Sequence, residues 1–296
     1  MLPTSLKPTA HRLLDRLAVL GSRRYVAGET VNAALTVIGK QIFPPERYII
    51  CPWNRPTDSV KGVFTSYLEA LDSLKDFPCD SFLSIKLPSL SYDAAMVEEL
   101  LNRAAALKIR IHFDALTPES VEPTIRVLAK LRARFSLFGY TIPGRWRRSL
   151  RDASSILDLQ IPLRVVKGQL PDRSGGEVDP REGFLQVVER ISRSTTSIGI
   201  ASHDPLLVTR SLSLLKGRIG GDEVEQLFGL KPVSVKVLGD TPTRLYIPYG
   251  HGYPPYDIYA AFRAPRLAAR MTRDVVSGIL RPVMDGLRVY QPGKNF

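Results

Sequence analysis

Short apolar runs recur along the chain and alternate with longer stretches whose apolar residues repeat at helical spacing. The short runs are typical of strands buried on both faces, and the longer stretches of amphipathic helices that cover such strands. The apolar runs predict strands at residues 48–51, 82–87, 109–113, 135–142, 163–166, 198–201, 224–227 and 244–247. The periodic stretches predict helices at residues 33–38, 60–74, 96–101, 183–193, 206–215, 256–273 and 275–287, one that begins at Thr117-Pro118 and one that extends through Leu157.

This alternation predicts an α/β fold, and eight strands over a chain of this length predict a single (β/α)8 (TIM-like) barrel. Residues 1–24 are expected to form an N-terminal helical segment and residues 25–296 the barrel, because no linker or shift in composition divides the latter. Proline is expected to end the first strand at Pro52 and the eighth at Pro248. Residues 233–238 alternate like a strand where the repeat requires a helix, and the pattern does not decide between the two.

The net charge of the chain bears on which partners it could bind. The 41 Lys and Arg residues outnumber the 29 Asp and Glu residues, and the net charge of +12 permits an acidic partner. It does not require one, because arginines dispersed along the predicted helices explain much of the excess. Aromatic and basic residues are not interleaved as in nucleic-acid-binding proteins, so no nucleic acid partner is expected.

Composition also bears on compartment and metals. No apolar run is long enough to span a membrane, and residues 1–20 lack the core of a signal peptide. The two cysteines, Cys51 and Cys79, cannot build a disulfide framework and suggest a reducing compartment, so a cytoplasmic protein is expected. The four histidines are scattered and no carboxylate cluster accompanies them, which predicts no metal site.

Charged and polar residues lie at the carboxyl ends of several predicted strands. The run 163–166 leads into Lys167-Gly168, the second strand ends near Lys86, Asp114 follows the third, and Ser202-His203-Asp204 follows the sixth. The carboxyl ends of parallel strands meet at one edge, where ligands bind in barrel proteins. A lysine there would present a cation to a ligand, and a glycine would let the backbone approach it closely.

Each of these residues also has a plainer interpretation. Lys86 and Asp114 could form an ion pair that closes the barrel mouth, and His203 could be a structural histidine bonded to the backbone. Tyr246 and Tyr256 could be aromatic side chains at the edge of the core. The residues considered one by one leave these alternatives open.

Seven segments together carry a resemblance to a known family. In chain order they are Tyr25-Val26-Ala27-Gly28-Glu29-Thr30, Ser84-Ile85-Lys86-Leu87, Asp114, Leu163-Arg164-Val165-Val166-Lys167-Gly168, Ala201-Ser202-His203-Asp204-Pro205, Glu223-Val224-Glu225-Gln226-Leu227-Phe228-Gly229 and Arg244-Leu245-Tyr246-Ile247-Pro248-Tyr249-Gly250. Their order resembles the proline dehydrogenase family, flavin enzymes on a distorted (β/α)8 barrel that oxidise L-proline to pyrroline-5-carboxylate. The resemblance covers about residues 22–270.

The resemblance implies FAD as the cofactor and assigns roles to particular positions. The implied catalytic residues are Lys86, Asp114, Arg164 and Tyr246. The implied cofactor contacts are Arg164, Val166, Lys167, Gly168, Gln169, Ser202, His203, Asp204, Glu225 and Gln226. The implied substrate pocket consists of Lys86, Asp114, Leu227, Tyr246, Tyr256, Tyr259 and Arg263. Arg164 would lie near the reactive edge of the flavin, where a cation favours the reduced ring.

The chain also departs from the family pattern. Tyr259-Ala260 stands where the family has two adjacent arginines that clamp the substrate carboxylate, and a bidentate arginine is the usual solution for such an anion. Arg263 and Arg266 follow on the same predicted helix and could replace the clamp. Glu225 stands in place of a glutamine that contacts the flavin, and a further family glutamine is missing around Ile142.

Three functions follow from these observations. The first is a FAD-dependent dehydrogenase that oxidises a C–N or N–N bond of a small amine or imino acid other than free proline, in specialised biosynthesis. In one version of this hypothesis the substrate carboxylate is masked, for example as a thioester on an acidic carrier protein. The second is L-proline dehydrogenase itself, with Arg263 or Arg266 in the clamp. The third is a barrel without catalysis that serves as a binding partner.

Overall fold

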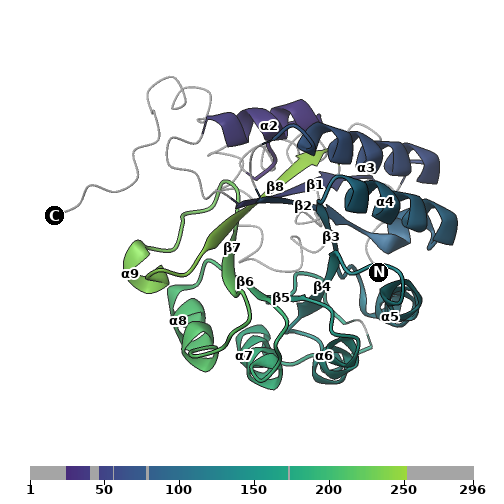
Figure 1. The fold of residues 1–296 in the computed structure, drawn as a ribbon. Coiled ribbons are helices and arrows are strands. Elements are labelled where there is room, and N and C mark those ends of the chain that lie inside the picture. The colour runs from purple at the N-terminus through teal and green to yellow at the C-terminus, as the bar shows by residue number, and fades with distance from the viewer. Residues whose placement is uncertain (1–24, 41–46, 56, 78–79, 173, 252–296) are drawn as a thin grey trace, which may run out of the picture.

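The computed structural model describes residues 25–40, 47–55, 57–77, 80–172 and 174–251. Within these ranges the strands close into one parallel barrel in the order β1-β2-β3-β4-β5-β6-β7-β8, and helices surround it (Figure 1). The strands are β1 Arg47–Trp53, β2 Asp80–Ile85, β3 Arg110–Phe113, β4 Phe138–Pro143, β5 Leu163–Val166, β6 Ile198–Ala201, β7 Glu223–Leu227 and β8 Thr243–Gly250. The predicted (β/α)8 barrel is therefore confirmed.

Most helices lie near the positions that the hydrophobic periodicity predicts, but η1 was not predicted, and it begins at Leu87, which was expected to end the second strand. They are α2 Val31–Gly39, α3 Val60–Leu74, the 3-10 helix η1 Leu87–Leu90, α4 Ala94–Ala106, α5 Pro118–Arg132, α6 Ser149–Asp158, α7 Pro180–Ile191, α8 Pro205–Leu214 and α9 Val235–Leu238. Local chemistry determines several of their starts. Helix α5 begins with a capping box between Thr117 and Ser120, with Pro118 at its first position. At the start of α7, Asp179 accepts hydrogen bonds from the first backbone amides of the helix.

Two layers of different character flank the strands. The side chains that point outward pack against the helices as one apolar core, with fully buried residues such as Ile50, Leu83, Ile111 and Val165. Successive side chains alternate across a strand, so the intervening residues point into the barrel. Most barrels of this kind fill their interior with branched apolar residues. Here many interior residues are polar or charged, and that interior positions the candidate site.

Two sequence predictions about strand ends are wrong. Strand β1 continues through Pro52, and β8 continues through Pro248 to Gly250. The reason is the register: β1 pairs with β2 only up to Ile50, whereas its pairing with β8 extends to Trp53. Beyond Ile50 one edge of β1 has no ladder partner, and a proline without an N–H is tolerated at an unpaired edge.

Two further boundaries differ from the sequence patterns. Strand β4 begins at Phe138 rather than at Phe135, because the preceding residues end the turn after α5. Residues 235–238 form the short helix α9, which resolves the conflict between strand-like alternation and the α/β repeat. Strands β7 and β8 pair directly with each other, so the segment between them cannot add a strand there. The predicted helices at 1–24, 256–273 and 275–287 lie outside the described residues.

Candidate active site

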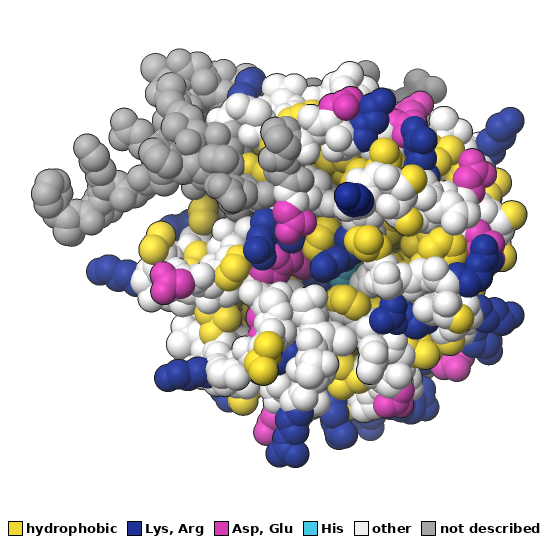
Figure 2. All heavy atoms as spheres, viewed as in Figure 1, with side chains coloured by type: hydrophobic (Ala, Val, Ile, Leu, Met, Phe, Trp, Pro, Cys, Tyr) yellow, Lys and Arg dark blue, Asp and Glu magenta, His cyan; other side chains and the backbone are white. Residues whose placement is uncertain are grey.

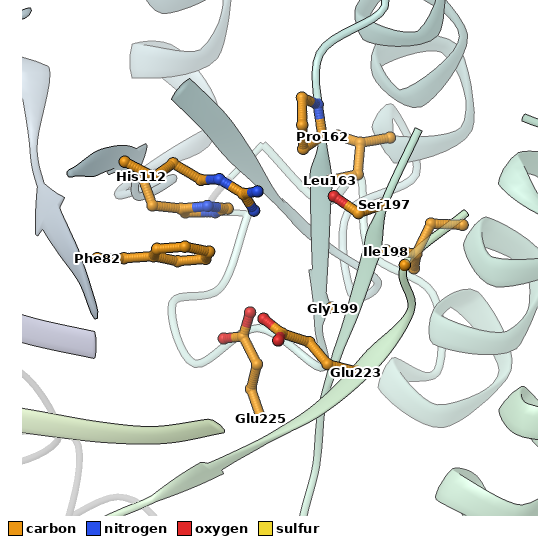
Figure 3. A pocket seen from close by; sticks show the side chains of 11 residues that line it. Phe82, His112, Pro162, Leu163, Ser197, Ile198, Gly199, Glu223 and Glu225 are labelled. Carbon is orange, nitrogen blue, oxygen red and sulfur yellow. The ribbon is translucent and has the colours of Figure 1, made fainter. Parts of the chain in front are cut away.

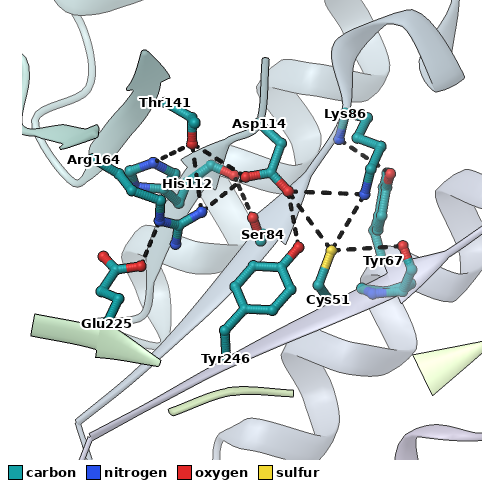
Figure 4. Close-up of polar contacts among 11 residues, drawn as sticks. Cys51, Tyr67, Ser84, Lys86, His112, Asp114, Thr141, Arg164, Glu225 and Tyr246 are labelled. Carbon is teal, nitrogen blue, oxygen red and sulfur yellow. Dashed lines mark hydrogen bonds and ion pairs between the residues drawn. The ribbon is translucent and has the colours of Figure 1, made fainter. Parts of the chain in front are cut away.

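Four residues predicted to be catalytic meet around the Asp114 carboxylate, which directly follows β3. Arg164 Nη1 donates to Asp114 Oδ1 at 2.8 Å, and the Tyr246 hydroxyl donates to Asp114 Oδ2 at 3.0 Å. Lys86 Nζ lies 3.8 Å from the same Oδ2. These residues come from β2, β3, β5 and β8 or the residues that directly follow them, and Figure 4 shows them converging on the Asp114 carboxylate. Closure of the barrel brings together residues that are far apart in the chain.

Arg164 is held by two carboxylates inside the barrel. Its Nε donates to Glu225 Oε2 at 2.5 Å, in addition to the contact with Asp114, and the side chain is 2% exposed. Space for Glu225 depends on Gly199 in the neighbouring strand, because a Cβ at residue 199 would lie 2.4 Å from Glu225 Oε1. Among the described residues, Arg164 Nη2 has no hydrogen-bond partner although it is buried. A buried guanidinium donor without a partner is costly unless a bound group accepts from it.

The charges in this cluster stabilise one another. Burial alone would lower the pKa of Arg164, but Glu225 and Asp114 outweigh burial and raise it, so the guanidinium stays charged. Burial would likewise lower the pKa of Lys86, and the Cys51 and Asp114 side chains raise it instead. Burial raises the pKa of Tyr246, and Asp114 raises it further, which keeps the phenol protonated as a donor. The cluster therefore presents two fixed cations and a neutral hydroxyl around one carboxylate.

Sequence reasoning missed three polar residues of this cluster. Cys51 Sγ lies 3.3 Å from Lys86 Nζ, Thr141 Oγ1 lies 3.2 Å from Asp114 Oδ1, and His112 Nε2 lies 3.0 Å from Thr141 Oγ1. Strand alternation offered a signal, because His112 and Asp114 are two residues apart and face the same side. Cys51 and Thr141 carry no comparable signal, since a buried cysteine or threonine is ordinary in a strand.

Hydrogen bonds join the segment after β5 to the segment after β4. Lys167 O accepts from the Arg145 backbone amide at 3.0 Å, and Gln169 O accepts from Arg145 Nη1 at 2.9 Å. Gly168 has φ of 89°, in the left-handed region that favours glycine. Val166 alternates with Val165 and so follows Arg164 on the inner face of β5. The predicted cofactor-binding residues of this segment thus line the barrel mouth, while their role stays a prediction.

The segment after β6 serves mainly to begin α8. Ser202 Oγ accepts from the Asp204 amide at 3.1 Å, and Asp204 caps the helix by accepting from Leu207 N. His203 Nδ1 lies 2.8 Å from Lys231 O, and Leu227 N donates to His203 Nε2 at 2.7 Å. This places the proton on Nδ1 of a neutral ring. Burial lowers the pKa of His203, which agrees with that neutral state.

His203 is therefore bonded to backbone through both ring nitrogens, as its plainer interpretation holds. No contact between described residues joins it directly to the Asp114 cluster, although Leu227, its donor, is in register with Tyr246. Glu225 points into the barrel, so its neighbour Gln226 points toward the helix layer, whereas Leu227 returns to the interior. Tyr256, Tyr259, Arg263 and Arg266 lie outside the described residues.

A second charged layer fills the barrel at the amino ends of the strands. Arg244 is 2% exposed and binds Glu223 through two contacts of 2.6 and 3.0 Å, and its Nη2 lies 2.9 Å from Asp80 Oδ2. The guanidinium groups of Arg244 and Arg110 lie 3.7 and 4.1 Å from the centre of the Phe82 ring. Figure 2 shows acidic and basic side chains gathered in the hollow centre of one face, with lysines and arginines around its rim.

A small cavity adjoins this layer. It is bordered by Phe82, His112, Glu223 and Glu225, and by Ser197, which directly precedes β6 and so marks the amino end (Figure 3). Its volume of about 10 Å³ has room for one water molecule. The cavity is too small for a substrate, so it does not compete with the cluster at the carboxyl ends as a candidate active site.

Two features are absent from the described ranges. No helix in them is both long and apolar enough to cross a membrane. No group of three or more His, Cys, Asp or Glu side chains in them is arranged to hold a metal ion.

Comparison with known proteins gives the cluster a context. Proline dehydrogenase 1 of Bacillus subtilis subsp. natto is 24% identical over a 288-residue alignment that covers 88% of this chain and 91% of the relative. Proline dehydrogenase 1 of Bacillus subtilis strain 168 is 23% identical with the same coverage. The chain is thus similar to two proline dehydrogenases over most of its length. The resemblance predicted from the strand ends is thereby confirmed, and no family model matches the chain.

Solved structures agree at the level of fold. Proline utilization A (PutA) from Bdellovibrio bacteriovorus, inactivated by N-propargylglycine, superimposes with a TM-score of 0.69 at 14% identity, over 91% of this chain and 34% of that chain. A PutA mutant from Bradyrhizobium japonicum gives a TM-score of 0.65 at 18% identity, over 87% of this chain and 31% of that one. The chain thus spans about a third of these PutA chains and has the fold of that part.

Proposed function

We propose that the chain is a flavin-dependent oxidoreductase that removes a hydride next to an amine nitrogen of a small substrate, with FAD as the cofactor. One observation carries the proposal: Lys86, Arg164 and Tyr246 all converge on Asp114 at the carboxyl end of the barrel. Barrel enzymes place their chemistry at that end. The relation to proline dehydrogenases supports the reaction class.

The donor set around Arg164 fits a flavin. Arg164 Nη2 is a buried donor without a partner among the described residues, and a flavin ring offers acceptor nitrogens and oxygens. Val166, Lys167, Gly168 and Gln169 would flank the ring, and Glu225 would reach it through Arg164. Ser202, His203, Asp204 and Gln226 would make their contacts through backbone atoms, because their side chains cap α8, bond to backbone or face outward. When bound, FAD supplies the hydride acceptor.

The contacts of Asp114 define its part in the proposed reaction. Its Oδ1 accepts a hydrogen bond from Arg164 Nη1 and lies 3.2 Å from the Thr141 hydroxyl. Its Oδ2 accepts a hydrogen bond from the Tyr246 hydroxyl and lies 3.8 Å from Lys86 Nζ. An ionised carboxylate has about four acceptor sites, so Asp114 has little capacity left to accept from a substrate. We therefore infer that Asp114 positions its donors. The Lys86 ammonium, which keeps further protons to donate, is then the group that orients a substrate.

The proposed substrate is an amine or imino acid whose carboxylate is masked. Tyr259-Ala260 replaces the arginine pair of the family, and loss of a charge-assisted bidentate contact in a dry site costs about 2–5 kcal/mol of binding. A thioester on a carrier protein has no carboxylate to clamp, and the net charge of +12 would favour an acidic carrier. Genuine L-proline dehydrogenase activity, with Arg263 or Arg266 in the clamp, is the alternative.

Two measurements test these proposals in sequence. The visible spectrum of the purified full chain, with and without added FAD, should show a bound flavin. Reduction of a dye acceptor is then followed with L-proline and, as a matched substrate, with an L-proline thioester that lacks the free carboxylate. Turnover of the thioester at least tenfold faster supports the masked substrate, and faster turnover of L-proline supports the relocated clamp.

The outcomes against the proposal are equally definite. A colourless protein that takes up no FAD would contradict flavin chemistry and leave the barrel as a binding partner. Substitution of Lys86 by Met should lower turnover at least a hundredfold with FAD still bound. Turnover unchanged in that variant would contradict the role assigned to Lys86.

A further inference from the structure

The cluster contains a close pair of side chains that the proposed reaction does not use together. Cys51 Sγ lies 3.3 Å from Lys86 Nζ, and Cys51 is fully buried while Lys86 is 8% exposed. Cys51 lies in β1, and Lys86 directly follows the adjacent strand β2. Asp114 Oδ2 lies 3.8 Å from both the sulfur and the nitrogen. Figure 4 shows the thiol and the ammonium pointing toward each other beside this carboxylate.

We propose that Cys51 and Lys86 form a reversible covalent bridge in which one oxygen atom links the sulfur to the side-chain nitrogen, with hydrogen peroxide as the oxidant. The bridge is a modification site that switches the cluster off, and it goes beyond the proposed function. It depends only on the pair itself and holds whether or not the chain oxidises an amine.

The chemistry balances with two equivalents of peroxide. The first converts the thiol of Cys51 to a sulfenic acid and releases one water molecule. The second joins the sulfenic acid to the neutral amine of Lys86, forms the N–O–S bridge and releases two water molecules. The extra proton of the Lys86 ammonium passes to Asp114 Oδ2, 3.8 Å away, and from there to solvent at the mouth. A thiol reductant reverses the modification by attack on the sulfur.

The geometry favours an oxygen bridge over a direct S–N bond. Both side chains are packed in the barrel, where large movements are resisted. A direct bond would require the sulfur and nitrogen to approach each other by well over an ångström from their separation of 3.3 Å. One inserted oxygen spans such a gap with much less movement. The side chains of Lys86 and Asp114 are 10% and 13% exposed, so a molecule as small as peroxide reaches the pair from the mouth.

The bridge would remove a charge from the cluster, and it would form slowly. It removes the ammonium that faces Asp114, which leaves the carboxylate with Arg164 and Tyr246 as its close donors. Burial raises the pKa of the Cys51 thiol, so the thiolate is scarce and the first oxidation is slow. The modification should therefore accumulate over hours under excess peroxide.

Mass spectrometry of the full chain after peroxide treatment tests the proposal. The expected product is about 14 Da heavier, from one oxygen gained and two hydrogens lost, and dithiothreitol returns it to the starting mass. Digestion should yield one linked species that contains the peptides of Cys51 and Lys86. A Cys79→Ser variant should behave in the same way, whereas Cys51→Ser and Lys86→Arg should not form the product.

Four results would overturn the bridge. An unchanged mass under conditions that oxidise free cysteine would show that the pair does not react. A product about 2 Da lighter would indicate a direct S–N bond, and one about 32 Da heavier without a linked peptide would indicate a sulfinic acid. Formation of the linked species in the Cys51→Ser variant would assign it to another residue.

Discussion

Gly199 carries the sharpest structural prediction, because a single methyl group there should disrupt the buried pair of Arg164 and Glu225. A Cβ at residue 199 would lie 2.4 Å from Glu225 Oε1 and 3.1 Å from its Cδ. An ordinary contact needs about 3.5 Å, so the carboxylate must move by about 1 Å. Glu225 is only 4% exposed, and once its carboxylate is displaced Arg164 would keep its contacts with Asp114 and, at 3.4 Å, with Thr141 Oγ1.

The expected cost follows from those contacts. Breaking a buried ion pair costs about 3–5 kcal/mol and overpacking about 1–3 kcal/mol, so partial retention of Arg164 by Asp114 leaves about 2–4 kcal/mol. Urea unfolding of Gly199→Ala, followed by tryptophan fluorescence, measures the loss in the free energy of unfolding. Gly39→Ala is the matched control, because a Cβ there meets no atom within 4 Å, and it should change stability by less than about 1 kcal/mol.

A double-mutant cycle decides whether the clash with Glu225 causes the loss of stability. In a Glu225→Ala background the carboxylate is gone, so adding Gly199→Ala should cost less than about 1 kcal/mol. A cost above about 2 kcal/mol in that background would refute the clash with Glu225. So would a Gly199→Ala chain that is as stable as the unsubstituted one.

Two further predictions concern the charged interior. Arg244→Met should lower the free energy of unfolding by about 3–5 kcal/mol, because it leaves buried Glu223 without its main partner. The control Arg103→Met removes an exposed ion pair and should cost less than about 1 kcal/mol. Equal urea midpoints for the two variants would contradict this prediction. Burial and the nearby Arg164 guanidinium hold the pKa of His112 well below its usual value. Below about pH 6.5, His112 binds a proton in the unfolded chain but stays neutral in the folded chain. The free energy of unfolding therefore does not depend on His112 above that pH, and it falls by about 1.4 kcal/mol per pH unit below it. Urea unfolding at pH 7.5 and 5.5 should show this slope reduced in His112→Gln; an identical slope in both proteins would assign the pH dependence to other groups.

Much of the fold was predictable because it depends on local patterns. Apolar runs such as Ile198–Ala201 and helical repeats such as Val60–Leu74 match the observed elements residue by residue. The errors at Pro52 and Pro248 arose because a proline rule assumes a ladder partner on both edges. The register leaves one edge of β1 unpaired at Pro52, and one edge of β8 unpaired at Pro248, because β8 pairs with β7 only up to Tyr246.

The candidate site was predictable only in part. The resemblance to proline dehydrogenases indicated Lys86, Asp114, Arg164 and Tyr246, and the structure joins them in one cluster. It could not indicate Cys51, because its proximity to Lys86 depends on how two strands pair and not on any spacing in the chain.

The sequence by itself determined that strands and helices alternate, where most of them begin and end, and which side of each strand is apolar, since these follow from side-chain periodicity along a single segment. Only the tertiary structure decided that charged residues fill the interior as paired groups, that Arg164 is shared between Asp114 and Glu225, and that a thiol lies beside the Lys86 ammonium. Those contacts join residues on different strands, and closure of the barrel sets the distances between them.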